Sequence, residues 1–322
     1  MPKLPIFVAV ILGLLAVRAS ATDRPGDRSG PWVIHYSGEP HLVSATDSVL
    51  KLTRASLQNF LRSDLDFEVD LYIAESEEEF DSLSYYRIPE WSVGVAISEL
   101  SLIVVKSPSL LSSNATLGYE KTVAHEYAHL ALDHRLRGVR PPRWFNEGMA
   151  MLVATDWGWQ NVLDLTMAGL FGNYVQLEEI EQINRFDRRK ASLAYSLSYL
   201  AVQYMYEEYG HEQVYVFLDS LAGNASIDNA LLGSVGSDYA NFDQEFHLYL
   251  KSRFNLITLA GDTVYFWLAM ALILILGAFL AYRKKRSYYR KWEDEEKLAS
   301  TDFDYGDPDN PERPDDDEPW RR

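Results

Sequence analysis

The sequence of 322 residues contains no cysteine. This absence excludes disulfide bonds, thiolate metal sites and enzymes that use a cysteine nucleophile. An exported eukaryotic domain of this size would usually carry disulfides, so an exported chain with this composition is more typical of a bacterial envelope. The sequence also shows no internal repeat.

The chain has fewer basic than acidic residues. The chain has 30 lysines and arginines against 47 aspartates and glutamates, and its formal net charge is -17. This balance argues against a surface that binds nucleic acid or anionic lipid. It suits cationic substrates, although ordinary solubility explains it equally well.

The first apolar run lies at the N-terminus. Lys3 precedes an apolar stretch at Ile6–Val17, and Ala19-Ser20-Ala21 follows as a small-residue cleavage signal. The stretch is shorter than the roughly 20 residues that a membrane crossing needs. The pattern predicts a secretory signal peptide over residues 1–21, with an uncleaved anchor as the alternative. With either a cleaved signal peptide or an uncleaved anchor, the residues that follow are expected to be exported.

The second apolar run, Val264–Tyr282, carries no charge over nineteen residues. Its length predicts one transmembrane helix, with a buried core helix as the alternative. Arg283, Lys284, Lys285 and Arg286 follow at once. Because basic residues favour the cytoplasmic side, we expect a single-pass protein with a cytoplasmic C-terminus and with the domain between the two apolar runs on the periplasmic or extracellular side.

The tail at residues 283–322 begins basic and then becomes acidic, with nine acidic residues between Thr301 and Glu318. Such a segment cannot bury enough apolar surface to offset its chain entropy, so it is predicted to be disordered. Docking to a cytoplasmic partner is the alternative to a solvated tail.

Between the apolar runs, residues 31–254 are long enough for one good-sized domain. Alternating or continuous apolar residues predict strands in the first half, at 32–36, 67–73, 92–97 and 101–106, the last two as a hairpin. The strand at 67–73 alternates apolar and polar residues and is predicted to be half-buried. Helical spacing predicts helices at 44–61, 75–83, 116–137, 142–155, 191–209, 211–221, 226–233 and 239–253. A strand-rich half followed by a helical half indicates an α+β domain.

Three of the seven histidines fall between Thr122 and His134, in TVAHEYAHLALDH. His125 and His129 are four apart, so they share one face of a helix and can bind a single ion. Glu126 lies about 100° round the helix and can reach a water beside the metal rather than the metal itself. The structural alternative is a helix with ion-paired histidines.

A catalytic zinc needs a third protein ligand and one open position. Glu147, in RPPRWFNEGMAML, follows His129 by eighteen positions. A turn at Gly138–Pro142 would fold this second helix back and direct Glu147 at the histidines, with Gly148 permitting close helix packing. The sequence thus predicts one zinc per chain on two histidines and a glutamate. His134 is off this face and is expected at the surface or behind the ligands.

These motifs resemble those of the peptidase MA-like group of gluzincin zinc metallopeptidases. The resemblance rests on HExxH, on PRWFNEGMA, on the helix AYSLSYLAVQYMYEEYG and on WSVGVAISELSLIVV before the zinc helix, and it covers residues 31–254. It implies zinc at His125, His129 and Glu147, and Glu126 as general base. One departure is Met151, where related enzymes often place an aspartate behind a ligating histidine, so that support must come from elsewhere.

The resemblance also implies a tyrosine as donor to the oxyanion. Tyr195 and Tyr199 are one helical turn apart, and Tyr195 is the better match. The strand pair should form one wall of the cleft, where a peptide can add as an extra strand. Glu99 loosely matches the glutamate with which aminopeptidases hold a substrate amino terminus, so an aminopeptidase is an alternative to an endopeptidase.

The sequence as a whole predicts a membrane-anchored zinc metallopeptidase. About ten residues separate the domain from the apolar run and reach at most about 35 Å, so envelope or membrane proteins are the expected substrates, near the outer face of the cytoplasmic membrane. Two other functions stay open. One is a non-enzymatic envelope module with structural zinc, and the other is a zinc hydrolase of a non-protein amide such as a cell-wall cross-link.

Overall fold

The computed structural model describes residues 26–38, 40–85, 92–111, 115–172, 174–254 and 264–299. The chain divides into two compact units, Met1–Leu256 and Ile257–Arg322. The predicted signal peptide and residues 300–322 of the predicted tail lie outside the described residues.

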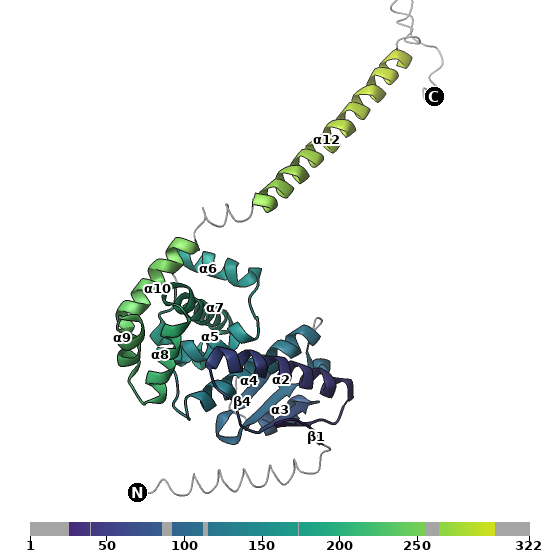
Figure 1. Ribbon diagram of the computed structural model, residues 1–322. Coiled ribbons are helices and arrows are strands. Elements are labelled where there is room, and N and C mark those ends of the chain that lie inside the picture. The colour runs from purple at the N-terminus through teal and green to yellow at the C-terminus, as the bar shows by residue number, and fades with distance from the viewer. Residues whose placement is uncertain are drawn as a thin grey trace, which may run out of the picture. The chain divides into compact units, whose positions relative to one another are not determined.

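The first unit contains a five-stranded mixed sheet with the order β1-β2-β3-β5-β4 (Figure 1). Its strands are β1 (Gly26–Ser29), β2 (Trp32–His35), β3 (Val69–Ala74), β4 (Gly94–Ile97) and β5 (Leu102–Lys106). The inner strands β2, β3 and β5 run parallel, and β1 and β4 pair antiparallel at the two edges. The predicted hairpin is therefore confirmed as β4 and β5.

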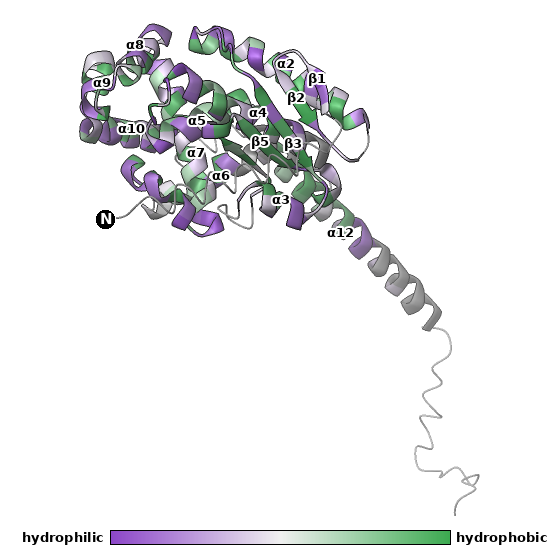
Figure 2. Cartoon of the chain, turned by 90° about the horizontal axis from the view of Figure 1, so that it is seen from below, coloured by the Kyte–Doolittle hydropathy of each residue, from purple (hydrophilic) through white to green (hydrophobic). Residues whose placement is uncertain are grey.

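Helices cover both faces of this sheet. Ile73, Ile103 and Val105 belong to the main core, together with α2 (Pro40–Leu61) and α4 (Ala115–Arg135), whereas alternate residues such as Tyr72 and Val104 pack with α3 (Glu77–Leu83). Figure 2 shows β3 and β5 as strongly hydrophobic strands. The prediction of a half-buried strand at 67–73 was wrong, because a parallel strand covered on both faces buries both sets of side chains.

The remainder of the first unit is mostly helical, as predicted. The predicted helices are found as α5 (Arg143–Val153), α7 (Arg188–Tyr204), α8 (His211–Ala222), α9 (Ile227–Val235) and α10 (Tyr239–Arg253), and a π-helical turn, Met205–Tyr209, extends α7. The structure adds elements that the sequence analysis did not predict, namely β1, α6 (Trp159–Phe171) and a 3₁₀ segment, Leu177–Arg185.

The second unit contains one long helix, α12 (Val264–Ala299). It continues past residue 282 into the segment predicted as disordered, where lysine, arginine, glutamate and alanine are good helix formers. Within the described ranges, no helix is both long and apolar enough to cross a membrane, and the transmembrane helix predicted at Val264–Tyr282 is therefore not supported.

Close contact between α5 and α7 depends on Gly148. A Cβ built on this residue would lie 2.1 Å from the carbonyl oxygen of Ser198 and 2.7 Å from Val202. The first of these atoms is backbone and cannot turn aside. Gly148 thus allows α7 to pack closely against α5 at the position directly after Glu147.

We predict that Gly148→Ala lowers the free energy of unfolding by about 3 kcal/mol, because the added methyl overpacks a helix contact. Urea denaturation followed by tryptophan fluorescence measures the effect. Gly233→Ala is the matched control. Gly233 lies inside α9 with no atom near its Cβ position, so alanine there should raise stability by about 0.5–1 kcal/mol. Equal shifts for both variants would contradict this account of the contact.

Candidate metal centre

The helix α4 has a buried side and a side that faces a cavity. Val123, Tyr127 and Ala131 are fully buried in the main core, whereas His125 and His129 are half-buried. The two histidines are one turn apart, and their Nε2 atoms approach to 3.1 Å. The helix thus presents both imidazoles to one point in space, as their spacing predicted.

The chain reverses direction after α4 and brings α5 alongside it. Gly138 has a φ of +77°, in the left-handed region, and its N–H donates to the Asp133 carbonyl at 3.0 Å. Pro142 then precedes the first residue of α5. Glu147 lies one turn into α5 and is 3% exposed, so the predicted turn and the predicted approach of Glu147 to the histidines are both present.

Three side-chain atoms form a near-equilateral triangle at the meeting point of α4 and α5. Glu147 Oε2 lies 3.5 Å from His125 Nε2 and 3.5 Å from His129 Nε2, and the two nitrogens complete the triangle. Tetrahedral zinc with ligand distances of about 2.0–2.1 Å would separate its ligand atoms by about 3.3 Å. These three residues could therefore hold one metal ion without moving far.

Two neighbours of Glu147 on α5 fix the orientation of the triangle. Asn146 Oδ1 lies 2.9 Å from His129 Nδ1, and because an amide oxygen only accepts, Nδ1 carries a proton and Nε2 is turned toward the centre. Arg143 Nε donates to Glu147 Oε1 at 2.7 Å, which leaves Oε2 for the histidines. The sequence did not show which residue stands behind the ligating histidine, because Met151 occupies the position where related enzymes often place an aspartate. In the structure, Asn146 contacts His129 in this way.

The electrostatics of the centre favour a charged carboxylate. Burial alone would raise the pKa of Glu147, but His129, the hydrogen bonds from both histidines and the charge of Arg143 hold it well below its usual range. For His129, burial lowers the pKa, but the charge of Glu147 outweighs this effect and raises it to about 9. The carboxylate of Glu147 and the imidazole of His129 thus stabilise one another's charged forms.

Glu126 lies beside the triangle and outside it, beneath the edge strand β4. It is 8% exposed, and burial raises its pKa, an effect that the charges of His125 and His129 partly offset. A Cβ on Gly94 of β4 would lie 3.0 Å from Glu126 Oε1 and 2.5 Å from Thr122 Cγ2. Only glycine allows the strand to pass so close above this carboxylate.

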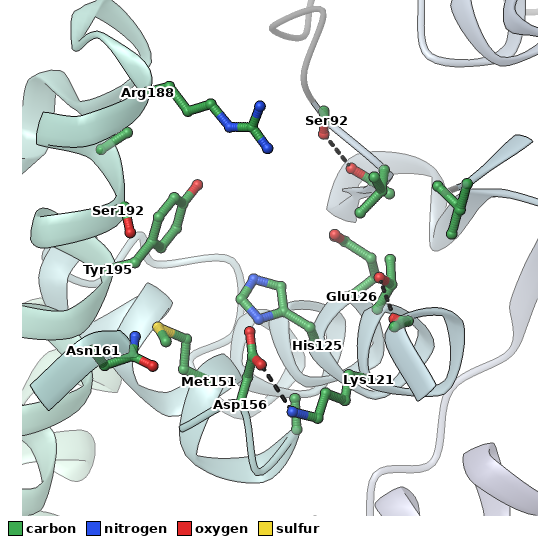
Figure 3. A pocket seen from close by; sticks show the side chains of 17 residues that line it. Ser92, Lys121, His125, Glu126, Met151, Asp156, Asn161, Arg188, Ser192 and Tyr195 are labelled. Carbon is green, nitrogen blue, oxygen red and sulfur yellow. Dashed lines mark hydrogen bonds and ion pairs between the residues drawn. The ribbon is translucent and has the colours of Figure 1, made fainter. Parts of the chain in front are cut away.

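A cavity of about 560 Å³ opens over His125 and Glu126. In Figure 3, Tyr195 and Arg188 of α7 form the wall opposite these two residues. Burial raises the pKa of Tyr195, and the charge of Glu147 adds to this rise, so the phenol stays protonated. The lining comes from β4, α4, α5, α6, α7 and adjoining loops, and it includes Gly94, Thr122, His125, Glu126, Met151, Arg188, Ser192 and Tyr195.

Three residues considered in the sequence analysis lie away from the centre. His134 is exposed and stacks on Phe67, with 4.8 Å between ring centroids, in agreement with a surface position. Glu99 is exposed, pairs with Arg140 at 3.2 Å and does not line the cavity. Tyr199 stacks on Trp157 and is likewise absent from the lining, which leaves Tyr195 as the tyrosine that faces the centre.

Sequence reasoning missed both Asn146 and Arg143. Arg143 stands four residues before Glu147, a spacing that allows an ion pair on one helix face and could have been noticed. Asn146 carried no comparable signal, because its partner His129 lies on another helix.

We predict that Asn146→Ala weakens divalent-metal binding by about 10–100-fold, since it removes the acceptor that orients His129. Competition with a chromogenic chelator measures the affinity. Asn146→Asp keeps an acceptor oxygen and should retain more of it, and Asn59→Ala, at an exposed position of α2, should leave it unchanged. Unaltered affinity in Asn146→Ala would show that the contact does not support the ligand.

Comparison with known proteins agrees with this arrangement. A search of curated proteins found no match. The family model of the peptidase MA superfamily, however, matches residues 44–252, a span that runs from α2 to α10 and includes the whole centre. With about two thirds of its length matched, the chain belongs to the peptidase MA superfamily, which points to a metal-dependent peptidase.

Proposed function

We propose that the protein is a zinc metallopeptidase that hydrolyses peptide bonds, with Glu126 as its general base. The observation that carries the proposal is the ligand triangle with a buried carboxylate next to it. His125, His129 and Glu147 offer three donor atoms to one ion. Glu126 is adjacent in sequence, lies outside the triangle and faces the cavity.

Zinc fits this donor set better than other common ions. Two imidazoles and one carboxylate are the ligands of many catalytic zinc sites, whereas calcium and magnesium prefer oxygen ligands. A structural zinc site is normally closed by four protein ligands. Here three ligands meet below a cavity, and His125 belongs to its lining, which favours a catalytic site over a structural one.

The proposed mechanism gives separate roles to the zinc, to Glu126 and to Tyr195. Zinc, when bound, supplies a Lewis acid that polarises the scissile carbonyl and makes the attacking water more acidic. The carboxylate of Glu126 accepts the proton of that water and passes it to the leaving amine. From the opposite wall, the Tyr195 hydroxyl donates a hydrogen bond to the carbonyl oxygen as it becomes negative.

The edge strand β4 offers a way to bind an extended peptide. Among the described strands it ends the sheet, paired only with β5, and its residue Gly94 lines the cavity. A substrate could extend the sheet along this edge through backbone hydrogen bonds and so bring its scissile bond above Glu126. This mode favours peptides over cell-wall amides, which lack a continuous peptide backbone to pair with a strand.

The type of peptidase and the location of the protein are two separate questions. An aminopeptidase would need Glu99 in the cleft, but that residue is exposed and paired with Arg140, so an endopeptidase is the version we propose. Location in the cell envelope is inferred from residues 1–21, which lie outside the described residues, and from the apolar run with its basic flank. Envelope proteins as substrates are inferred from the short link between the domain and that run. Both stay predictions from the sequence.

Glu126→Gln tests the general base. This change preserves size but removes basicity, so zinc content and melting temperature should stay near those of the wild type while hydrolysis falls by about 10²-fold or more. The assay incubates the purified protein with a denatured protein mixture and counts new termini by mass spectrometry. If wild type and variant release the same fragments, or neither releases any, the proposed function fails.

Tyr195→Phe tests the oxyanion donor, and Tyr199→Phe is its matched control one turn along α7. Loss of the Tyr195 hydroxyl should lower kcat by about 10²-fold with little change in KM, because the hydrogen bond strengthens only as charge develops. Tyr199→Phe should stay near wild type. Equal effects from both changes would remove Tyr195 from the mechanism.

A further inference from the structure

A second cavity residue of α7, Arg188, has no part in the mechanism above. It is the first residue of the helix and is exposed. Ser192 and Tyr195 follow four and seven positions later, so all three lie along one helix face. In Figure 3 the guanidinium of Arg188 extends into the cavity above the Tyr195 side chain.

The charges around the cavity leave this guanidinium available. Lys121 is paired with Asp156 at 3.0 Å. Asp187, next to Arg188 in sequence, caps α7 instead by accepting from the N–H groups of Arg189 and Lys190 at 2.9 Å. Within the described part of the chain, Arg188 forms no ion pair, although it lines the same cavity as Glu126.

Helix stability does not explain an arginine at this position. The first turn of α7 carries three consecutive cations, where the helix dipole favours acidic residues. Lys190 has a local partner, because it pairs with Glu179 at 3.1 Å and lies over the ring of Phe186. Among the described residues Arg188 has no such partner, and it points into the cavity, so its place is better explained by a ligand.

We propose that Arg188 binds a carboxylate of the substrate and makes the enzyme prefer peptides that carry one near the scissile bond. This inference rests on the proposed peptidase function and adds its substrate class. The planar guanidinium can grip a carboxylate through two parallel hydrogen bonds. The chain's net charge of -17 repels acidic peptides at long range, so a preference for them requires a local cation such as this one.

The carboxylate can come from an acidic side chain or from a free C-terminus, and matched peptides separate the two sources. One pair of peptides differs only by glutamate or glutamine near the scissile bond, and the second pair differs only by a free or an amidated C-terminus. Wild type should cleave the carboxylate member of one pair about 10-fold better in kcat/KM, mainly through KM, as expected for one charge-assisted contact.

Variants of Arg188 then identify the residue responsible. Arg188→Gln should bring the ratio within the preferred pair close to one, and Arg188→Glu should invert it, so that the member without the carboxylate is cleaved better. Arg189→Glu is the matched control, because it makes the same change in net charge one position away, at an exposed residue outside the cavity lining. It should keep the wild-type ratio.

A second measurement separates this inference from the proposed function. Fluorescence anisotropy gives the affinity of the same peptides for zinc-loaded Glu126→Gln, with and without Arg188→Gln, so recognition is read without turnover. A carboxylate preference in binding without any wild-type cleavage would overturn the peptidase but leave the inference standing. Cleavage or binding with no preference in either pair, or a preference that survives Arg188→Gln, would overturn the inference alone.

Discussion

The contact between one buried carboxylate and two imidazoles is the constraint on which the rest of the structure depends. Glu147 is 3% exposed, and an isolated charge at that depth would cost several kcal/mol. His125, His129 and Arg143 offset the cost by surrounding both of its oxygens. The hairpin of α4 and α5 thus buries Glu147 in an arrangement that is also a ligand set, so folding and metal binding favour the same geometry.

Two glycines bring the remaining walls of the cavity to this contact. Gly148 lets α7 pack against α5, directly behind Glu147, and this places Tyr195 and Arg188 opposite α4. Gly94 lets β4 pass over Glu126. The three proposed ligands, Glu126 and Tyr195 all stand on helices rather than on loops, which suits a site whose groups must be held in place before the substrate arrives.

Much of the architecture could be read from periodicity. The hairpin of β4 and β5, the helix with the two histidines and the helices of the second half all follow from local patterns of apolar residues. The errors occurred where burial depends on distant neighbours. β3 is buried on both faces because β2 and β5 flank it and helices cover it. The helix α6 was not predicted.

For the site, the sequence by itself determined the residues whose relation is local. His125 and His129 share a helix face because they are four apart, Glu126 adjoins them, and a short turn limits where Glu147 can lie. Tertiary structure alone decided the rest. It set Asn146 behind His129 and turned Tyr195, the tyrosine that the resemblance had favoured, toward the cavity. Such pairings depend on how separate helices pack, and no spacing along the chain encodes the distance between two helices.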